Sequence, residues 1–156
     1  MDTKSRTFQY KINMRSLLLN KQLNKMKIIE SDLCTFCKLE PETPEHLFTE
    51  CKHTCTFWEE FLKWWHTKFN DNKQIQEVDI LFGIFSRDNY MYDILLNQCL
   101  IVAKQSIYNC RCIDIHPSFD FFWKKLKSIY TVEKKLPIKI KKLPNLKESG
   151  KMYLFK

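Results

Sequence analysis

Residues 34–51 read Cys-Thr-Phe-Cys-Lys-Leu-Glu-Pro-Glu-Thr-Pro-Glu-His-Leu-Phe-Thr-Glu-Cys, and this stretch decides the expected fold. Its spacing is C-x2-C-x8-H-x4-C. Three thiolates and one imidazole form a ligand set typical of a closed, tetrahedral, structural zinc site. The two residues between the first cysteines allow a tight turn that directs both sulfurs at one ion. The sequence therefore predicts one zinc ion held by Cys34, Cys37, His46 and Cys51.

A short helix is expected to carry the second half of this ligand set. Thr43 can cap it, Pro44 fits the first helical position, and Glu45 suits the positive helix end. His46 would then lie in the first turn and face back to the cysteine pair. Cys51 is five residues further on, which in an α-helix points it away from His46, so we expect the helix to end at or just before Cys51.

Two other residues compete for the last ligand positions. His53 and Cys55 lie just beyond Cys51, and either would lengthen the second loop of the site. A further cluster of Cys110, Cys112 and His116 is conceivable, but one residue between two cysteines is poor spacing for zinc. The capped helix favours His46 and Cys51.

The composition limits the class of protein. The chain has 156 residues, of which 44% are hydrophobic, and only two glycines and five prolines, so long regular elements are expected. The seven cysteines are an odd number, and the polar N-terminus resembles no secretion signal, so reduced thiols in nucleus or cytoplasm are expected. No apolar run is long enough to span a bilayer, so no membrane partner is expected.

Charge is distributed unevenly along the chain. Residues 1–30 carry seven basic and two acidic groups, and residues 117–156 carry eleven basic and three acidic groups. Residues 31–86, which include the predicted zinc site, carry five basic and ten acidic groups. Because surfaces that bind phosphates are basic, contacts with nucleic acid are expected from the two flanks.

Hydrophobic periodicity predicts an all-α fold. Two short amphipathic helices are expected between Thr7 and Lys27, with Asn20 as the cap of the second. Thr56 and Glu59 form a capping-box pattern that predicts a helix to about Phe69. Its aromatic side chains have helical spacing, so core packing is favoured over base stacking.

The second half of the chain continues this pattern. Residues 79–84 form a short apolar segment, expected as a turn or a brief extended piece. A long helix is expected from residues 87–90 to about Cys112; its apolar residues surround it almost completely, which predicts a central position with Cys99 in the core. Pro117 and Ser118 begin a last helix, and from Pro137 a flexible basic tail is expected. The predicted division is a zinc-stapled domain over residues 1–136, with its zinc module at about 30–52, and a tail over 137–156.

Catalytic motifs are missing from the sequence. Two glycines cannot form a phosphate-binding loop, and neither a G-x-S-x-G elbow nor an HExxH motif is present. No closely paired acids suggest a two-metal polymerase site. We therefore do not expect an enzyme.

Several ordered motifs resemble a known family. They are Phe8-Gln-Tyr-Lys-Ile-Asn13, Asn20-Lys-Gln-Leu23, the Cys34–Cys51 block with its His-Leu-Phe, Phe57-Trp58, and Asp79-Ile-Leu-Phe-Gly83. In this order they resemble the reverse-transcriptase zinc-binding region at the C-terminus of non-LTR (LINE-type) retrotransposon proteins. Ile107-Tyr108 with Arg111, and the basic helix after Pro117, are similar to the animal versions. The resemblance covers about residues 8–136.

The resemblance implies a zinc site and a role in nucleic-acid binding. It assigns the zinc to Cys34, Cys37, His46 and Cys51, and implies assistance in binding element RNA or target DNA, with a reverse-transcriptase core as a further partner. The sequence departs from the family pattern at Met14, where many relatives have His, and it holds no polymerase or endonuclease segment, so it implies no catalysis by this chain. The alternatives are a zinc-stapled protein-interaction domain or an element remnant without nucleic-acid binding.

The expected contacts with RNA or DNA phosphates are basic side chains on the polar faces of the first and last helices and in the tail. A solvated polar face is the alternative interpretation for the N-terminal ones. The candidates are Lys4, Arg6, Lys11, Arg15, Lys21, Lys25, Lys124, Lys125, Lys127, Lys141 and Lys142.

Overall fold

The computed structural model describes residues 2–70, 74–85 and 90–135. The chain divides into two compact units, Met1–Leu126 and Lys127–Lys156, and the boundary falls within the last helix. Across the described ranges the structure is helical and has no strand, apart from one isolated antiparallel bridge between Leu33 and Pro41. The all-α expectation is confirmed, whereas the expected tail lies outside the described residues.

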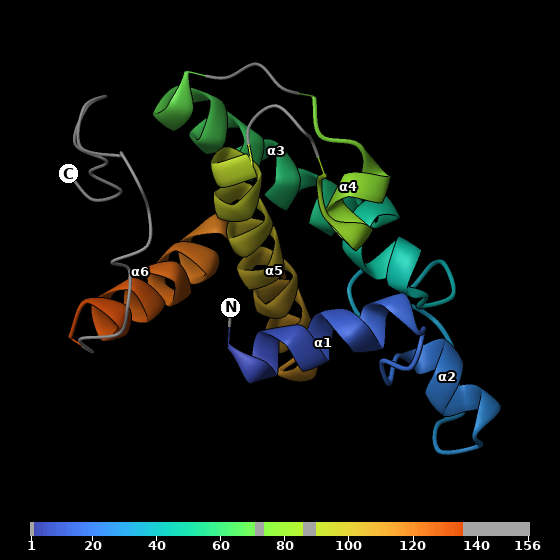
Figure 1. Ribbon diagram of the computed structural model, residues 1–156. Coiled ribbons are helices and arrows are strands. Elements are labelled where there is room, and N and C mark those ends of the chain that lie inside the picture. Colours follow the sequence, from blue (N-terminus) through green and yellow to red (C-terminus); the bar gives the residue numbers. More distant parts are fainter. Residues whose placement is uncertain (1, 71–73, 86–89, 136–156) are drawn as a thin grey trace, which may run out of the picture. The chain divides into compact units, whose positions relative to one another are not determined.

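Two short helices open the chain, as expected: α1 spans Thr3–Asn13 and α2 spans Asn20–Lys25 (Figure 1). α1 begins earlier than its apolar pattern indicates, because Asp2 Oδ1 accepts a hydrogen bond from Ser5 N at 2.6 Å and caps the helix. The expectation that Asn20 caps α2 is wrong. Asn20 is the first helical residue, and its side-chain amide donates instead to Leu33 O at 2.7 Å.

The third long segment begins earlier than its capping-box pattern predicts. A π-helical turn, η1, spans His46–Glu50, and α3 follows at once over Lys52–Phe69. Thr56 therefore lies inside α3, where its hydroxyl donates to Lys52 O at 3.1 Å rather than capping a helix. The predicted end at Phe69 is confirmed, and Asn70 adopts a left-handed conformation there with φ of 49°.

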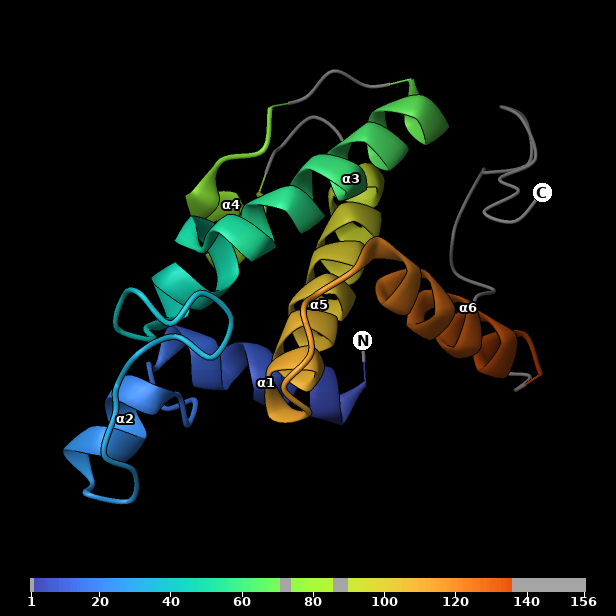
Figure 2. The same cartoon turned by 180° about the vertical axis from the view of Figure 1, so that it is seen from behind.

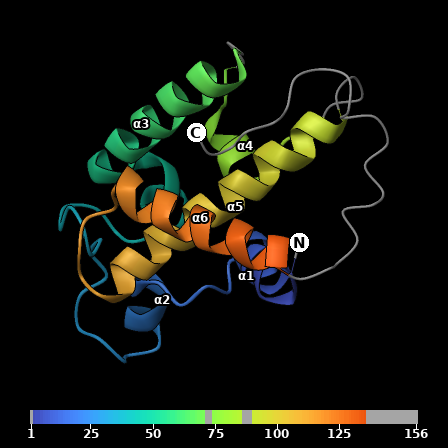
Figure 3. The ribbon, with the colours of Figure 1, turned by 90° about the vertical axis from the view of Figure 1, so that its left-hand side faces the viewer.

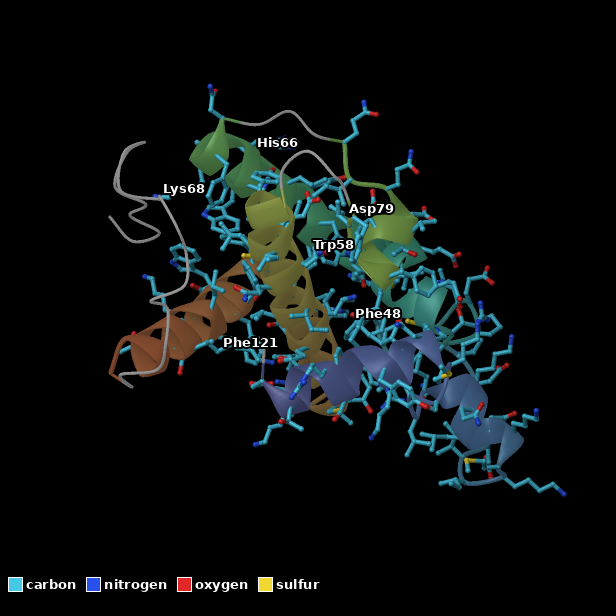
Figure 4. All side chains as sticks on the ribbon, viewed as in Figure 1. Phe48, Trp58, His66, Lys68, Asp79 and Phe121 are labelled. Carbon is cyan, nitrogen blue, oxygen red and sulfur yellow. The ribbon has the colours of Figure 1, made fainter. Side chains whose placement is uncertain are left out.

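Within the segment 79–84, expected as a turn or extended piece, residues 79–82 belong to a helix. α4 spans Glu77–Phe82, and a reciprocal capping box explains it: the Gln76 side chain accepts from the backbone of Asp79, and the Asp79 carboxylate accepts from Gln76 N at 3.0 Å. Asp79 is labelled in Figure 4. Gly83, at φ of 94°, ends the helix in a conformation that disfavours other residues.

The longest helix is central, as predicted. α5 spans Tyr90–Cys112, and α6 spans Phe119–Lys135. Figures 1 and 2 show α1 crossing the C-terminal half of α5 and α3 crossing its N-terminal half. Cys99 is 2% exposed, which confirms its place in the core. The other buried apolar residues of α5 are Leu96, Leu100, Ile101, Val102, Ala103, Ile107 and Cys110.

Aromatic side chains fill the space that α3, α5 and the first turns of α6 share. The Phe61 ring lies 5.4 Å from Phe122 and 6.3 Å from Trp65, centroid to centroid, and all three side chains are fully buried. The Trp65 indole N–H donates to the Tyr92 hydroxyl. This density confirms the core interpretation of the aromatic pattern. In the part of the chain that the structure describes, no helix combines the length and apolar character needed to cross a membrane.

Candidate metal centre and basic helices

Four side chains from three local elements meet at one point. The sulfurs of Cys34, Cys37 and Cys51 and a ring nitrogen of His46 all lie within 4.8 Å of one another. Cys34 Sγ and Cys51 Sγ are 3.9 Å apart, and Cys37 Sγ and His46 Nε2 are 3.3 Å apart. A tetrahedron with Zn–S bonds of about 2.3 Å and a Zn–N bond of about 2.0 Å has edges of roughly 3.5 to 3.8 Å. The donor atoms are therefore placed to hold a metal ion.

A tight turn brings the first two sulfurs together. Cys34 N donates to Glu40 O at 2.7 Å, and Lys38 N donates back to Cys34 O at 2.9 Å. Lys38 takes a left-handed conformation with φ of 57° and so reverses the chain directly after Cys37. The bridge between Leu33 and Pro41 closes the loop behind the turn.

The second half of the cluster uses a π turn rather than the end of an α-helix. Thr43 does cap the segment, since its hydroxyl accepts from His46 N at 3.0 Å. Cys51 N then donates to His46 O at 2.8 Å, which is a bond five residues long. A wider turn brings the fifth residue back over the first, so the His46 and Cys51 side chains face the same point. The expected conflict between the x4 spacing and a helix is resolved in this way.

Side chains of α3 satisfy the carbonyl groups of this π turn. Thr54 donates to Leu47 O at 2.8 Å, Trp58 Nε1 donates to Phe48 O at 2.6 Å, and Cys55 Sγ donates to Thr49 O at 3.2 Å. Phe48 and Trp58 are labelled in Figure 4. Because buried carbonyl groups need partners, these three bonds fix the turn that positions His46 and Cys51. The helical spacing had indicated Trp58 as a core aromatic and gave no sign of this hydrogen bond.

The electrostatics of the cluster favour a thiolate at Cys51. Cys34 donates to Cys51, and this hydrogen bond lowers the pKa of the Cys51 thiol to about 4, while it raises the pKa of Cys34 together with burial. A cation at the centre would replace the shared proton, because metal binding displaces protons from thiols. On the other side of the imidazole, His46 Nδ1 faces Glu50 Oε2 at 3.8 Å, which is the position of an outer carboxylate partner.

A buried ion pair ties the cluster to α5. The Glu42 side chain is fully buried and accepts from Arg111 Nε at 2.9 Å, from Thr35 N at 2.7 Å and from Asn20 N at 3.0 Å. Arg111 Nη2 also donates to the Asn20 side chain at 2.7 Å. The C-terminal end of α5 and the start of α2 accordingly lie close together (Figure 3). Glu42 has no periodic signal in the sequence, and the one cue to Arg111 was its place in the family resemblance.

The competing ligands do not join the cluster. The His53 ring stacks on the His116 ring with centroids 4.1 Å apart, and Cys55 is engaged with Thr49. Cys110 is buried and Cys112 is exposed. Among the described residues, Cys34, Cys37, His46 and Cys51 form the one cluster with metal-binding geometry, so the alternative site at Cys110, Cys112 and His116 is not supported.

The predicted N-terminal phosphate contacts are exposed on α1, on α2 and, for Arg15, in the segment between these helices. Of the six N-terminal candidates, Arg15 is the one with a described salt bridge, 2.6 Å to Glu45; the six are Lys4, Arg6, Lys11, Arg15, Lys21 and Lys25. On α6, Lys124 pairs with Asp120 at 2.6 Å, and Lys125 is half-buried, which lowers its pKa.

The two remaining groups of candidates lie beyond the first unit. Lys127 is exposed and belongs to the second unit. Lys141 and Lys142 lie outside the described residues.

Comparison with known proteins agrees with this geometry. A family model described as zinc-binding in reverse transcriptase matches residues 1–58. The match includes all four residues of the cluster and ends in the first turns of α3, so α4, α5 and α6 lie outside it. No curated protein and no solved structure matches the chain. The donor set and the match agree on zinc as the metal for this cluster.

Proposed function

We propose that this chain is a non-catalytic zinc module that binds the backbone of RNA or DNA. In this proposal Cys34, Cys37, His46 and Cys51 hold one structural zinc ion, and no position is left open for a substrate. The zinc fixes the fold of residues 30–52, and the flanking helices supply the phosphate contacts. The proposed location of the protein is the nucleus or the cytoplasm.

One observation carries the proposal. The segment that matches a reverse-transcriptase zinc-binding family begins with two helices whose basic side chains point to solvent. The basic residues of these two helices have no described salt bridge, so their charge is available to phosphate oxygens; they are Lys4, Arg6, Lys11, Lys21 and Lys25. The ordered motifs support a finer proposal, that the relatives are LINE-type retrotransposon proteins and that the module assists their polymerase in holding element RNA or target DNA.

The test is a binding titration of the zinc-loaded chain at two salt concentrations. Non-specific binding is expected at a Kd of about 10⁻⁴ to 10⁻⁶ M at physiological salt, and it should weaken steeply as salt rises. Lys21→Glu combined with Lys25→Glu should weaken binding to every sequence, while Lys63→Glu combined with Lys68→Glu, on α3, serves as the control with the same charge change. Removal of residues 137–156 should also flatten the salt dependence. Binding that is undetectable at low salt would refute the proposal.

A second function is favoured by a separate surface. An open groove of about 630 Å³ lies between α3 and the first turns of α6, with Trp64, Phe119 and Trp123 in its wall. Half-exposed aromatic side chains of this kind are enriched where proteins bind one another. A docking site for a polymerase core is therefore the alternative, and it would take over if the salt titration shows no binding.

A further inference from the structure

A second groove lies on a basic part of the surface, apart from the groove between α3 and α6. It lies between α1 and α5, has a volume of about 340 Å³, and will be called the α1–α5 groove. Its volume is at the lower end of the range for sites that hold a small ligand. Its principal lining residues are Lys4, Thr7, Phe8, Lys11, Leu17 and Tyr108.

The groove has a preformed apolar wall. The Tyr108 ring lies 5.6 Å from the Phe8 ring and 5.8 Å from the guanidinium carbon of Arg111. Arg111 is itself fixed by the buried Glu42. Because Phe8 and Arg111 both contact Tyr108, an incoming flat ring would meet a wall that is already ordered and would not have to organise it.

The charges at the groove rim have one sign. Lys4 and Lys11 are two exposed cations, and the described residues that line the groove include no carboxylate. The groove between α3 and α6 differs, since Lys63 and Lys68 are balanced there by Glu60 and Asp120. An anionic ligand is therefore favoured in the α1–α5 groove over the groove between α3 and α6.

The spacing of the two lysines fits a strand rather than a single anion. They are seven residues apart on one helix, which is about 10 Å along the axis at 1.5 Å per residue. A stacked strand carries one phosphate about every 3.4 Å, so the two ammonium groups can contact different phosphates of one chain. The apolar wall lies between them and matches the flat face of a base.

We propose that the α1–α5 groove binds an unpaired nucleotide of a single-stranded polynucleotide, with its base against Phe8, Leu17 and Tyr108 and phosphates on either side of that nucleotide on Lys4 and Lys11. A base inside a duplex is stacked on both faces and cannot enter such a recess, so single strands are selected. This inference rests on the proposed function and names the site that performs it.

The experiment compares single strands with a duplex, using the zinc-loaded full chain. The probes are a labelled 12-nucleotide RNA, the DNA of the same sequence, and the corresponding duplex. Thr7→Trp fills the groove from an exposed position without changing charge. It should reduce single-strand affinity by about 5-fold to 150-fold, the range that one stacked base contributes, and leave duplex affinity unchanged. Zinc content and helical signal equal to those of the original chain show that the variant is folded.

A charge pair supplies the second readout. Lys4→Gln combined with Lys11→Gln should reduce the slope of log affinity against log salt by about 1.4, because each phosphate contact to a single strand contributes about 0.7. Lys63→Gln combined with Lys68→Gln removes the same charge from the other groove and should leave the slope unchanged. Groove-dependent binding of either the RNA or the DNA supports the inference and identifies the strand.

The outcomes separate the two proposals. If the original chain binds no probe at low salt, the proposed function itself is refuted. If it binds but Thr7→Trp leaves single-strand affinity unchanged, or if the two lysine pairs change the slope equally, the groove is not the site and only this inference is overturned.

Discussion

The zinc loop, residues 30–52, and the helical core formed by α3 and α5 both contain fully buried side chains but are ordered by different forces. Cys34, Leu47 and Cys51 are fully buried in the loop, as Phe61 and Leu96 are in the core. Burial of apolar surface stabilises the core, by about 25 cal/mol of free energy for each Å² removed from water. In the loop, the chain is held by metal-ligating atoms that face one point and by hydrogen bonds from Thr54, Trp58 and Arg111 outside the loop. The loop therefore depends on partners that the core does not need.

Loss of a zinc ligand should have the largest effect and should be confined to the loop. Structural zinc contributes about 10–16 kcal/mol of apparent binding free energy in isolated finger peptides. Cys37→Ser and His46→Ala should each abolish stoichiometric zinc, whereas Cys112→Ser, at an exposed position outside the cluster, should retain it. Metal analysis of the purified variants measures this directly. Full zinc occupancy in His46→Ala, with loss in a His53→Ala variant, would overturn the ligand assignment.

Removal of the metal from the original chain sharpens the same comparison. After chelation, hydrogen exchange should rise first in residues 30–52, while the amides of α3 and α5 stay protected by their aromatic core. Loss of the whole helical signal on chelation would show that the core depends on zinc after all.

The two regions also differ in how far they could be predicted. The ligands were predictable because coordination geometry requires fixed spacing between nearby residues, and the central place of α5 followed from its apolar residues on all sides. The π turn could not be predicted, because it differs from an α-helical turn by one backbone hydrogen bond, from Cys51 N to His46 O. Side chains of α3, which are distant from the pattern of the turn itself, stabilise it by bonding its carbonyl groups. The start of α3 was not predicted because its first four residues carry no cap pattern, and α4 was not predicted because its N-cap, Gln76, is not one of the residues usually preferred there.

Arg111→Met should have the next largest effect, because it leaves the Glu42 carboxylate buried without its cation. Breaking a buried pair costs about 3–5 kcal/mol of unfolding free energy. Glu42→Leu combined with Arg111→Met should recover part of that loss, since both charges are then gone. Urea unfolding of the single and double variants measures the coupling. Hydrogen exchange should rise at residues 32–42 in Arg111→Met; equal stability of the variant and the original chain would contradict an energetic role for the pair.

Trp58→Phe should have a smaller effect at the contact between the loop and the core. The ring stays in its aromatic surroundings, but Phe48 O loses the indole N–H that it accepts at 2.6 Å. A buried carbonyl without a partner costs about 1–3 kcal/mol. Because that carbonyl belongs to the π turn, zinc affinity should fall together with stability. Trp64→Phe, which touches no carbonyl of the turn among the described contacts, is the control and should leave zinc affinity unchanged.

Lys104 gives the sharpest contrast with Arg111. It is a cation of α5 that is 1% exposed, and it donates to Gln9 Oε1 at 2.6 Å and to Leu81 O at 2.9 Å, both neutral acceptors. Burial lowers the pKa of Lys104 to about 7 from an ordinary value of 10.5. Between these two values the unfolded chain binds more protons than the folded chain, so stability should rise with pH from about 7 towards 10.5.

The slope of that rise is bounded by one proton, which is about 1.4 kcal/mol of unfolding free energy per pH unit. Below about pH 7 the lysine is protonated in both states, and its full destabilising contribution is present. Lys104→Met keeps the length of the side chain and removes the titration, so it should flatten the unfolding free energy measured between pH 7 and pH 10. Lys63→Met, at an exposed position, should keep the slope of the original chain. If Lys104→Met also keeps the slope of the original chain, the buried lysine is charged in the folded state across this pH range. Its two neutral acceptors are then enough to hold a buried cation, whereas the buried cation of Arg111 is paired with the Glu42 carboxylate.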